Sequence, residues 1–202
     1  MKNLKKITLA VCTMMLLIVS GCGNNDKEEV KKEEKTKLVV NDVYEAPKKA
    51  NEAQIKLFNR LSKAINEQDS EEEIAKLVAC NFAFDFFTLS NKEDGSDVGG
   101  LTYLPENYRE EFSVFAQNHY YNSYATIVKQ YDKDSLPTMA EVKVEKTTPS
   151  ALYVGDITGD GYMIELTAKY ENTELSNDAL KTSMTIQVLI NDSGRAEVIG
   201  LE

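Results

Sequence analysis

The spacing of apolar side chains divides the chain into a helical part followed by a strand-rich part. A first set of apolar residues recurs three or four positions apart and comprises Leu57, Phe58, Leu61, Ala64 and Ile65. Because this spacing places side chains on one face of a helix, it predicts an amphipathic helix that ends near Gln68.

A second helix is predicted from about residue 70 to about residue 90. Ser70 can cap its first turn, and Glu73 stands three residues later, as in a capping box. Apolar residues nearly encircle the second half of this segment: Ile74, Leu77, Val78, Phe82, Phe84, Phe86, Phe87 and Leu89. A helix that is apolar on most sides is expected to be covered on most sides.

The same helix carries a narrow polar stripe of Asn81, Asp85 and Thr88, spaced four and three residues apart. One interpretation is a solvated edge. The other is a polar patch held inside a pocket, where an ionised Asp85 among phenylalanines needs water or a partner.

Residues 91–137 are predicted to form a loop followed by further helix. Asp94-Gly95 and Gly99-Gly100 are turn signals, and Pro105 is suited to the first position of a helix. The apolar face of this helix shifts by about one residue beyond Asn118, which predicts a bend near 118–121 or two consecutive helices. Leu136-Pro137 ends the helical part.

From residue 140 the pattern changes to the alternation typical of strands. Apolar and polar side chains alternate over 140–145, 164–170 and 184–190, and a last strand is predicted over 196–201. With residues 151–157 included, about five antiparallel strands joined by hairpins are expected.

The segment 156–161 is similar to the start of a calcium loop of the Asp-x-Asn-x-Asp-Gly type. The twelfth position is Thr167, however, where a bidentate Glu is needed, and strand alternation follows where a helix should leave the loop. A Gly-rich hairpin turn is predicted here instead, and no metal site is expected.

The first 22 residues have the features of an export signal. Lys2, Lys5 and Lys6 precede an apolar run over 7–19, which is too short to span a bilayer comfortably. Val19-Ser20-Gly21-Cys22 resembles the lipobox of bacterial lipoproteins. The resemblance implies that residues 1–21 are cleaved and that the Cys22 thiol carries a diacylglyceryl group, which anchors the protein at the outer face of the cytoplasmic membrane. An uncleaved anchor helix is the alternative.

Residues 22–50 are predicted to form a flexible, charged tether, because they contain no aromatic residue before Tyr44 and few apolar ones. Residues 51–202 are then enough for one domain with one core. The chain has 23 Lys and Arg against 33 Asp and Glu, for a net charge of −10. Within residues 51–202 the basic residues are scattered singly, so nucleic acid and anionic lipid headgroups are not expected as direct partners.

The order of helices before hairpin-linked strands resembles the NTF2-like, or cystatin-like, superfamily over residues 50–202. The resemblance implies an α+β fold in which N-terminal helices pack on a curved antiparallel sheet that forms a cone with a cavity. Members include isomerases, dehydratases, polyketide cyclases and transport factors, so the fold does not choose a function. The lipid-tethered domain, rich in Lys, Glu and Asn, also looks like the lipoproteins of low-GC Gram-positive bacteria.

His119 is the only histidine, which excludes sites with two histidine ligands. One interpretation places it at the edge of the core, bonded to a backbone carbonyl or a tyrosine. The other makes it a general base in a cavity with Asp85 and one of Tyr108, Tyr120 or Tyr124, similar in residue types to isomerase and cyclase sites.

Six tyrosines fall within residues 103–131, and the chain has no tryptophan. Tyrosine combines apolar area with a polar tip, so Tyr108, Tyr120 and Tyr124 are candidates for ligand binding, with an ordinary place in the core as the alternative. Cys12 leaves with the signal and Cys22 is lipidated, which leaves Cys80 without an intrachain partner. A buried thiol is predicted there, with a reactive or intermolecular thiol as the alternative.

These observations favour a binding or interaction module that presents an aromatic cavity to a small apolar ligand, a cell-wall fragment or another envelope protein. Catalysis is not expected, nor is any cofactor beyond the diacylglyceryl group on Cys22. The alternatives are a cavity enzyme of isomerase or cyclase type that uses proton transfer, and a structural surface protein that forms homodimers through its sheet.

Overall fold

The computed structural model describes residues 36–171, 173, 175 and 179–202. These residues form four α-helices, α1 (Glu52–Asn66), α2 (Glu71–Phe87), α3 (Arg109–His119) and α4 (Tyr124–Tyr131). Two short 3₁₀ helices, η1 (Leu101–Tyr103) and η2 (Glu106–Tyr108), precede α3. The strands are β1 (Thr138–Val154), β2 (Ile157–Glu171), β3 (Ser183–Ile190) and β4 (Ala196–Leu201).

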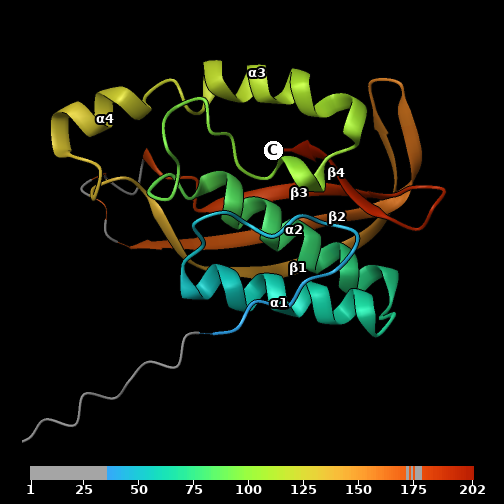
Figure 1. Cartoon of the computed structure of the whole chain (residues 1–202). Helices are drawn as coiled ribbons and strands as arrows, with labels where there is room; N and C mark the ends of the chain where they lie inside the picture. Colours follow the sequence, from blue (N-terminus) through green and yellow to red (C-terminus); the bar gives the residue numbers. More distant parts are fainter. Residues whose placement is uncertain (1–35, 172, 174, 176–178) are drawn as a thin grey trace, which may run out of the picture. The chain divides into compact units, whose positions relative to one another are not determined.

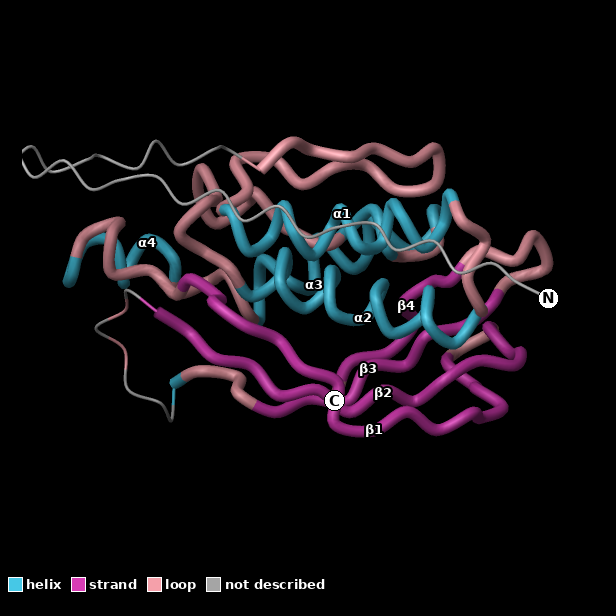
Figure 2. The backbone as a smooth tube through the Cα atoms, turned by 90° about the horizontal axis from the view of Figure 1, so that it is seen from below, coloured by secondary structure: helices cyan, strands magenta, loops and turns pink. Residues whose placement is uncertain are grey.

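The strands form one antiparallel sheet in the order β1-β2-β3-β4, with each strand paired to the next along the chain. Figure 2 shows α1, α2 and α3 on the same side of this sheet. The predicted α+β class is therefore confirmed. No helix within the described ranges is long and apolar enough to cross a membrane.

The helix boundaries follow from local signals in the sequence. Ser70 caps α2 as predicted, since its hydroxyl oxygen accepts the Glu73 N–H at 3.3 Å. The predicted bend is the break between α3 and α4, where the Tyr120 and Tyr121 N–H groups both donate to the Ala116 carbonyl. Pro105 lies just before η2 rather than inside a helix, and its lack of an N–H costs nothing there.

Helix α2 is the central element of the core. Ten of its residues are buried, among them Phe82, Phe84 and Phe86. Helix α1 packs against α2, and α2 also contacts all four strands (Figure 1). The prediction that this apolar helix is covered on most sides is confirmed. Its thiol, Cys80, is buried and unpaired, and desolvation raises the pKa of that thiol to about 12.

The described sheet has four strands, so the expectation of about five was wrong: the segment 151–157 is not a separate strand. Residues 151–154 continue β1, and the hairpin turn is formed by Gly155 and Asp156. Pro149 does not end β1. Because β1 is an edge strand, one side of its backbone has no partner strand, and a proline without an N–H is tolerated in such a strand. Two register irregularities, at Met139/Glu141 and Val144/Lys146, interrupt the pairing of this long strand.

The Gly-rich segment 156–161 is mostly strand rather than turn. Gly155 has a φ of 58°, which a two-residue hairpin turn demands, whereas Thr158 to Gly161 pair with β1. A Cβ atom on Gly161 would collide with the Val188 carbonyl oxygen of β3. This glycine therefore allows close approach of the neighbouring strand, which the sequence pattern alone could not distinguish from a turn.

The folded unit begins near residue 35, earlier than the boundary predicted at residue 51. Residues 36–50 were expected to belong to the tether, but they lie against α1. The Val39 N–H donates to Asn59 Oδ1 at 2.7 Å, and Asn41 Nδ2 donates to Ser62 Oγ at 2.8 Å. Tyr44 is buried, and its hydroxyl donates to the Ala196 carbonyl at 2.6 Å. The buried Tyr44 side chain and these hydrogen bonds hold residues 36–50 on the domain.

Replacing Tyr44 with alanine should therefore lower the free energy of unfolding by about 3 kcal/mol or more, as for other buried aromatic residues. Tyr153→Ala is the matched control, because Tyr153 is 75% exposed and should cost less than about 1 kcal/mol. Urea denaturation followed by circular dichroism measures both. Equal losses would contradict the packing of residues 36–50 onto the domain.

Candidate functional site

A mainly apolar groove of about 400 Å³ lies between α3, the end of β4 and the tip of the β1–β2 hairpin. Figure 1 shows this tip turning up beside α3. We call it the aromatic groove. Its helical side consists of Leu104, Pro105, Tyr108, Glu111, Phe112, Phe115 and Tyr120, and its strand side of Val154, Gly155, Ile157, Val198, Ile199, Gly200 and Leu201, with Phe82 of α2 also in the lining.

Helical spacing places the α3 residues on one side of the groove. Tyr108, Glu111, Phe112 and Phe115 stand three and four positions apart, so their side chains share one face. Part of the groove lining stays open to solvent, since Phe115 is 47% exposed and Tyr120 is 42% exposed. The groove therefore presents aromatic rings to its open side.

Tilted and edge-to-face contacts between aromatic rings connect the groove to the core. The Phe82 and Phe112 ring centroids are 6.0 Å apart, and Phe86 lies 5.5 Å from Phe112 and 5.3 Å from Tyr120. Phe82 and Phe86 are fully buried in α2. Since α2 is the best-packed helix, these contacts give the exposed rings a rigid base.

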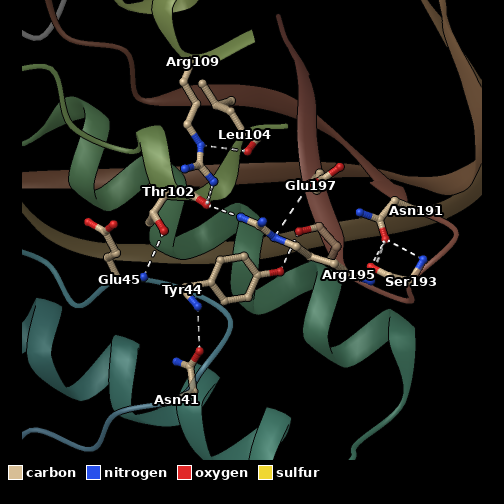
Figure 3. Close-up of polar contacts among 11 residues, drawn as sticks. Asn41, Tyr44, Glu45, Thr102, Leu104, Arg109, Asn191, Ser193, Arg195 and Glu197 are labelled. Carbon is tan, nitrogen blue, oxygen red and sulfur yellow. Dashed lines mark hydrogen bonds and ion pairs between the residues drawn. The ribbon is translucent and has the colours of Figure 1, made fainter. Parts of the chain in front are cut away.

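A polar clasp holds the groove wall at Leu104 and Pro105 in place (Figure 3). Arg195, between β3 and β4, donates to the Thr102 carbonyl at 2.6 Å, and its guanidinium lies 5.2 Å from the Tyr44 ring centroid. Arg109 donates to the same carbonyl at 3.4 Å and to the Leu104 carbonyl at 3.3 Å. Glu197, 3.7 Å from Arg195 Nε, balances one of the two positive charges.

Asp85 lies outside the aromatic groove, in a largely buried ion pair. Its Oδ1 accepts from Lys92 Nζ at 2.8 Å and from Gln54 Nε2 at 3.1 Å, and its Oδ2 accepts from the Gly100 N–H at 2.7 Å. The side chains of Lys92 and Asp85 are only 5% and 15% exposed. These bonds tie α1, α2 and the 91–100 loop together, and they make Asp85 a structural anchor.

The remaining polar stripe of α2 is also buried and satisfied within the protein. Asn81 donates to the Leu77 carbonyl at 2.8 Å and to the Leu57 carbonyl at 3.4 Å. The Thr88 hydroxyl accepts the Met139 N–H at 3.3 Å. Of the two interpretations of this stripe, the solvated edge is wrong, and the buried patch has protein partners rather than a ligand.

His119 is exposed at the end of α3. Its Nδ1 is 2.9 Å from the Phe115 carbonyl oxygen, and its ring stacks on Phe115 with centroids 4.2 Å apart. The contact with a backbone carbonyl matches the first interpretation, whereas the exposed position of His119 does not match the predicted place at the edge of the core. His119 and Asp85 have no hydrogen-bond partner in common and neither lines the groove, so the structure does not assemble the predicted acid–base pair.

The three candidate tyrosines have different places. Tyr108 and Tyr120 line the groove. Tyr124 is buried, and its hydroxyl donates to the Lys92 and Glu93 carbonyls at 3.0 and 3.2 Å, so it belongs to the core. Tyr121 is also in the core, where its hydroxyl donates to the Phe86 carbonyl at 2.6 Å, and burial raises its pKa.

Sequence reasoning missed the strand side of the groove. Residues from β4 and from the hairpin tip reach it only through the sheet register, which no local pattern reveals. One signal was present: Val198 and Ile199 are consecutive apolar residues in a strand, which indicates that both faces are covered. Among the described residues, no group of three or more His, Cys, Asp or Glu side chains could hold a metal ion.

Asp85→Ala should lower the free energy of unfolding by about 3–5 kcal/mol, because it leaves the buried Lys92 ammonium without its counter-ion. The control is Glu93→Gln, which breaks an ion pair with Lys49. The Glu93 and Lys49 side chains are 69% and 57% exposed, so the loss should be much smaller than for Asp85→Ala. Urea denaturation compares the two. A small loss for Asp85→Ala would contradict the anchoring role.

No protein-family model, curated protein or solved structure matches this chain. The geometry and chemistry of the aromatic groove are therefore the basis for assigning a function.

Proposed function

We propose that this protein is a lipid-anchored extracytoplasmic lipoprotein whose domain binds a small apolar ligand in the aromatic groove. The observation that supports this most is the groove itself, which has an apolar lining on both sides and a volume of about 400 Å³. Ligand sites of soluble proteins have volumes of about 300–1,000 Å³ and are lined mostly by apolar and aromatic side chains.

The exposure of the groove residues supports the same proposal. Phe115 and Tyr120 remain nearly half exposed, whereas the aromatic residues beneath them, Phe82 and Phe86, are fully buried. Leaving large apolar side chains in water is unfavourable by about 25 cal/mol for each Å². A ligand that covers them would recover this free energy, and the rigid aromatic base beneath them lowers the ordering cost of binding.

The alternative of a proton-transfer enzyme has less support. Such an enzyme needs an acid or base beside its substrate, whereas both oxygens of Asp85 accept bonds within the protein and His119 is outside the groove. Glu111 is the one ionisable carboxylate among the groove residues, and no described side chain is paired with it as a second catalytic group.

Dimerisation through the sheet also has less support. The sheet face turned away from the helices carries charged side chains such as Glu165 and Lys169, which form exposed ion pairs with Lys146 and Glu141. Charged side chains are depleted at the centre of stable interfaces.

The finer fold assignment is part of the same proposal: we infer an NTF2-like domain. Helices that precede an antiparallel meander, and a long apolar helix packed on one face of the sheet, are consistent with it. In such a domain the ligand site would lie between the helices and the sheet, and the aromatic groove is lined by residues of both.

The ligand site is tested with Phe115→Ala. Dodecyl maltoside, a neutral alkyl probe, should bind the wild-type protein below its micelle concentration, and the variant should bind about tenfold more weakly because a large contact surface is lost. Val114→Ala is the matched control, since Val114 is 55% exposed on the same helix but does not line the groove. Isothermal titration calorimetry measures both, and equal affinities would contradict the proposal.

The lipid anchor is tested with Cys22→Ala, at a residue outside the described part of the chain. In a bacterial host that processes lipoproteins, the wild-type protein should incorporate labelled palmitate and require detergent for release from membranes. The variant should incorporate none, since the acylated thiol is gone. Palmitate labelling of the variant at the wild-type level would overturn the anchor.

A further inference from the structure

One carboxylate interrupts the apolar lining of the aromatic groove. Glu111 is the only charged residue in the lining, and its side chain forms no ion pair with any described residue. It lies in the first turn of α3 on the same face as Tyr108 and Phe112. A negative charge beside aromatic rings is a suitable environment for an organic cation.

The nearest positive charge in the sequence is directed elsewhere. Arg109 donates to the Thr102 and Leu104 carbonyls and lines a different depression, together with Arg195 and residues 41–46 (Figure 3). No lysine or arginine lines the aromatic groove itself. An anionic headgroup would therefore meet Glu111 without a compensating cation, in a chain whose net charge is −10.

We propose that the ligand of the aromatic groove is an amphiphilic cation. Its alkyl or aromatic body lies between α3 and β4, and its ammonium group lies against Glu111 and the Tyr108 ring. This inference rests on the proposed function and adds the charge of the ligand. Exposed cation–π contacts and exposed ion pairs each contribute modestly, so selectivity for the cation should be a few-fold rather than absolute.

The test compares three probes with the same alkyl chain, dodecyltrimethylammonium, dodecyl maltoside and dodecyl sulfate, by isothermal titration calorimetry below their micelle concentrations. The protein is the chain from residue 22 onward with Cys22→Ser, so that no lipid competes for the probes. Every buried core residue of the described structure lies after this point. The cation should bind about fivefold more tightly than the neutral probe, and added salt should weaken binding of the cation alone.

Glu111→Gln should weaken binding of the cation by about two- to fivefold and leave the neutral probe unchanged. Glu110→Gln is the matched control, because it removes the same charge from the same helical turn at a residue that does not line the groove. Tyr108→Leu, which keeps apolar area but removes the ring, should also weaken the cation selectively.

Two results would overturn the inference, and they differ in what they say of the proposed function. If all three probes bind equally and Glu111→Gln changes nothing, the groove binds apolar ligands without a preference for cations. If no probe binds the wild-type protein, the proposed function fails together with the inference.

Discussion

The structure depends on the burial of one helix. The second half of α2 is apolar on nearly every side, and only a position between α1 and the sheet removes all of these side chains from water. Its buried phenylalanines belong to one apolar cluster with Ile164, Ile186 and Val188 of the strands, which are fully buried. Because protein interiors are close-packed, the position of α2 determines where α1 and the strands can lie.

The polar residues of α2 show how the same burial imposes hydrogen bonds. Asn81, Asp85 and Thr88 all have protein partners, because a buried polar group without one is costly. The Asp85 carboxylate also holds the backbone of Gly100, a residue with a φ of 81°. This bond brings the 91–100 loop against α2 and so sets the start of η1, from which the groove wall continues.

The aromatic groove lies between α3 and the strands, with Phe82 of α2 in its lining. Its strand side comes from the end of β4 and the β1–β2 hairpin tip, and Phe115 and Tyr120 on its helical side are only partly covered. The clasp of Arg195, Arg109 and Tyr44 fixes the adjoining wall from the other side (Figure 3). Residues 36–50 thus support the aromatic groove without lining it, since Tyr44 carries both the ring under Arg195 and the bond to β4.

The sequence by itself determined the helices, most of the strands, the Ser70 cap and the burial of α2 and Cys80, because these follow from side-chain periodicity and local capping over a few residues. Only the tertiary structure decided that Asp85 pairs with Lys92, that Tyr124 is core while Tyr120 is exposed, and that Tyr44 belongs to the domain. It also decided that residues 151–154 extend β1. Each of these outcomes depends on contacts between segments far apart in the chain, and periodicity carries no information about which segments meet.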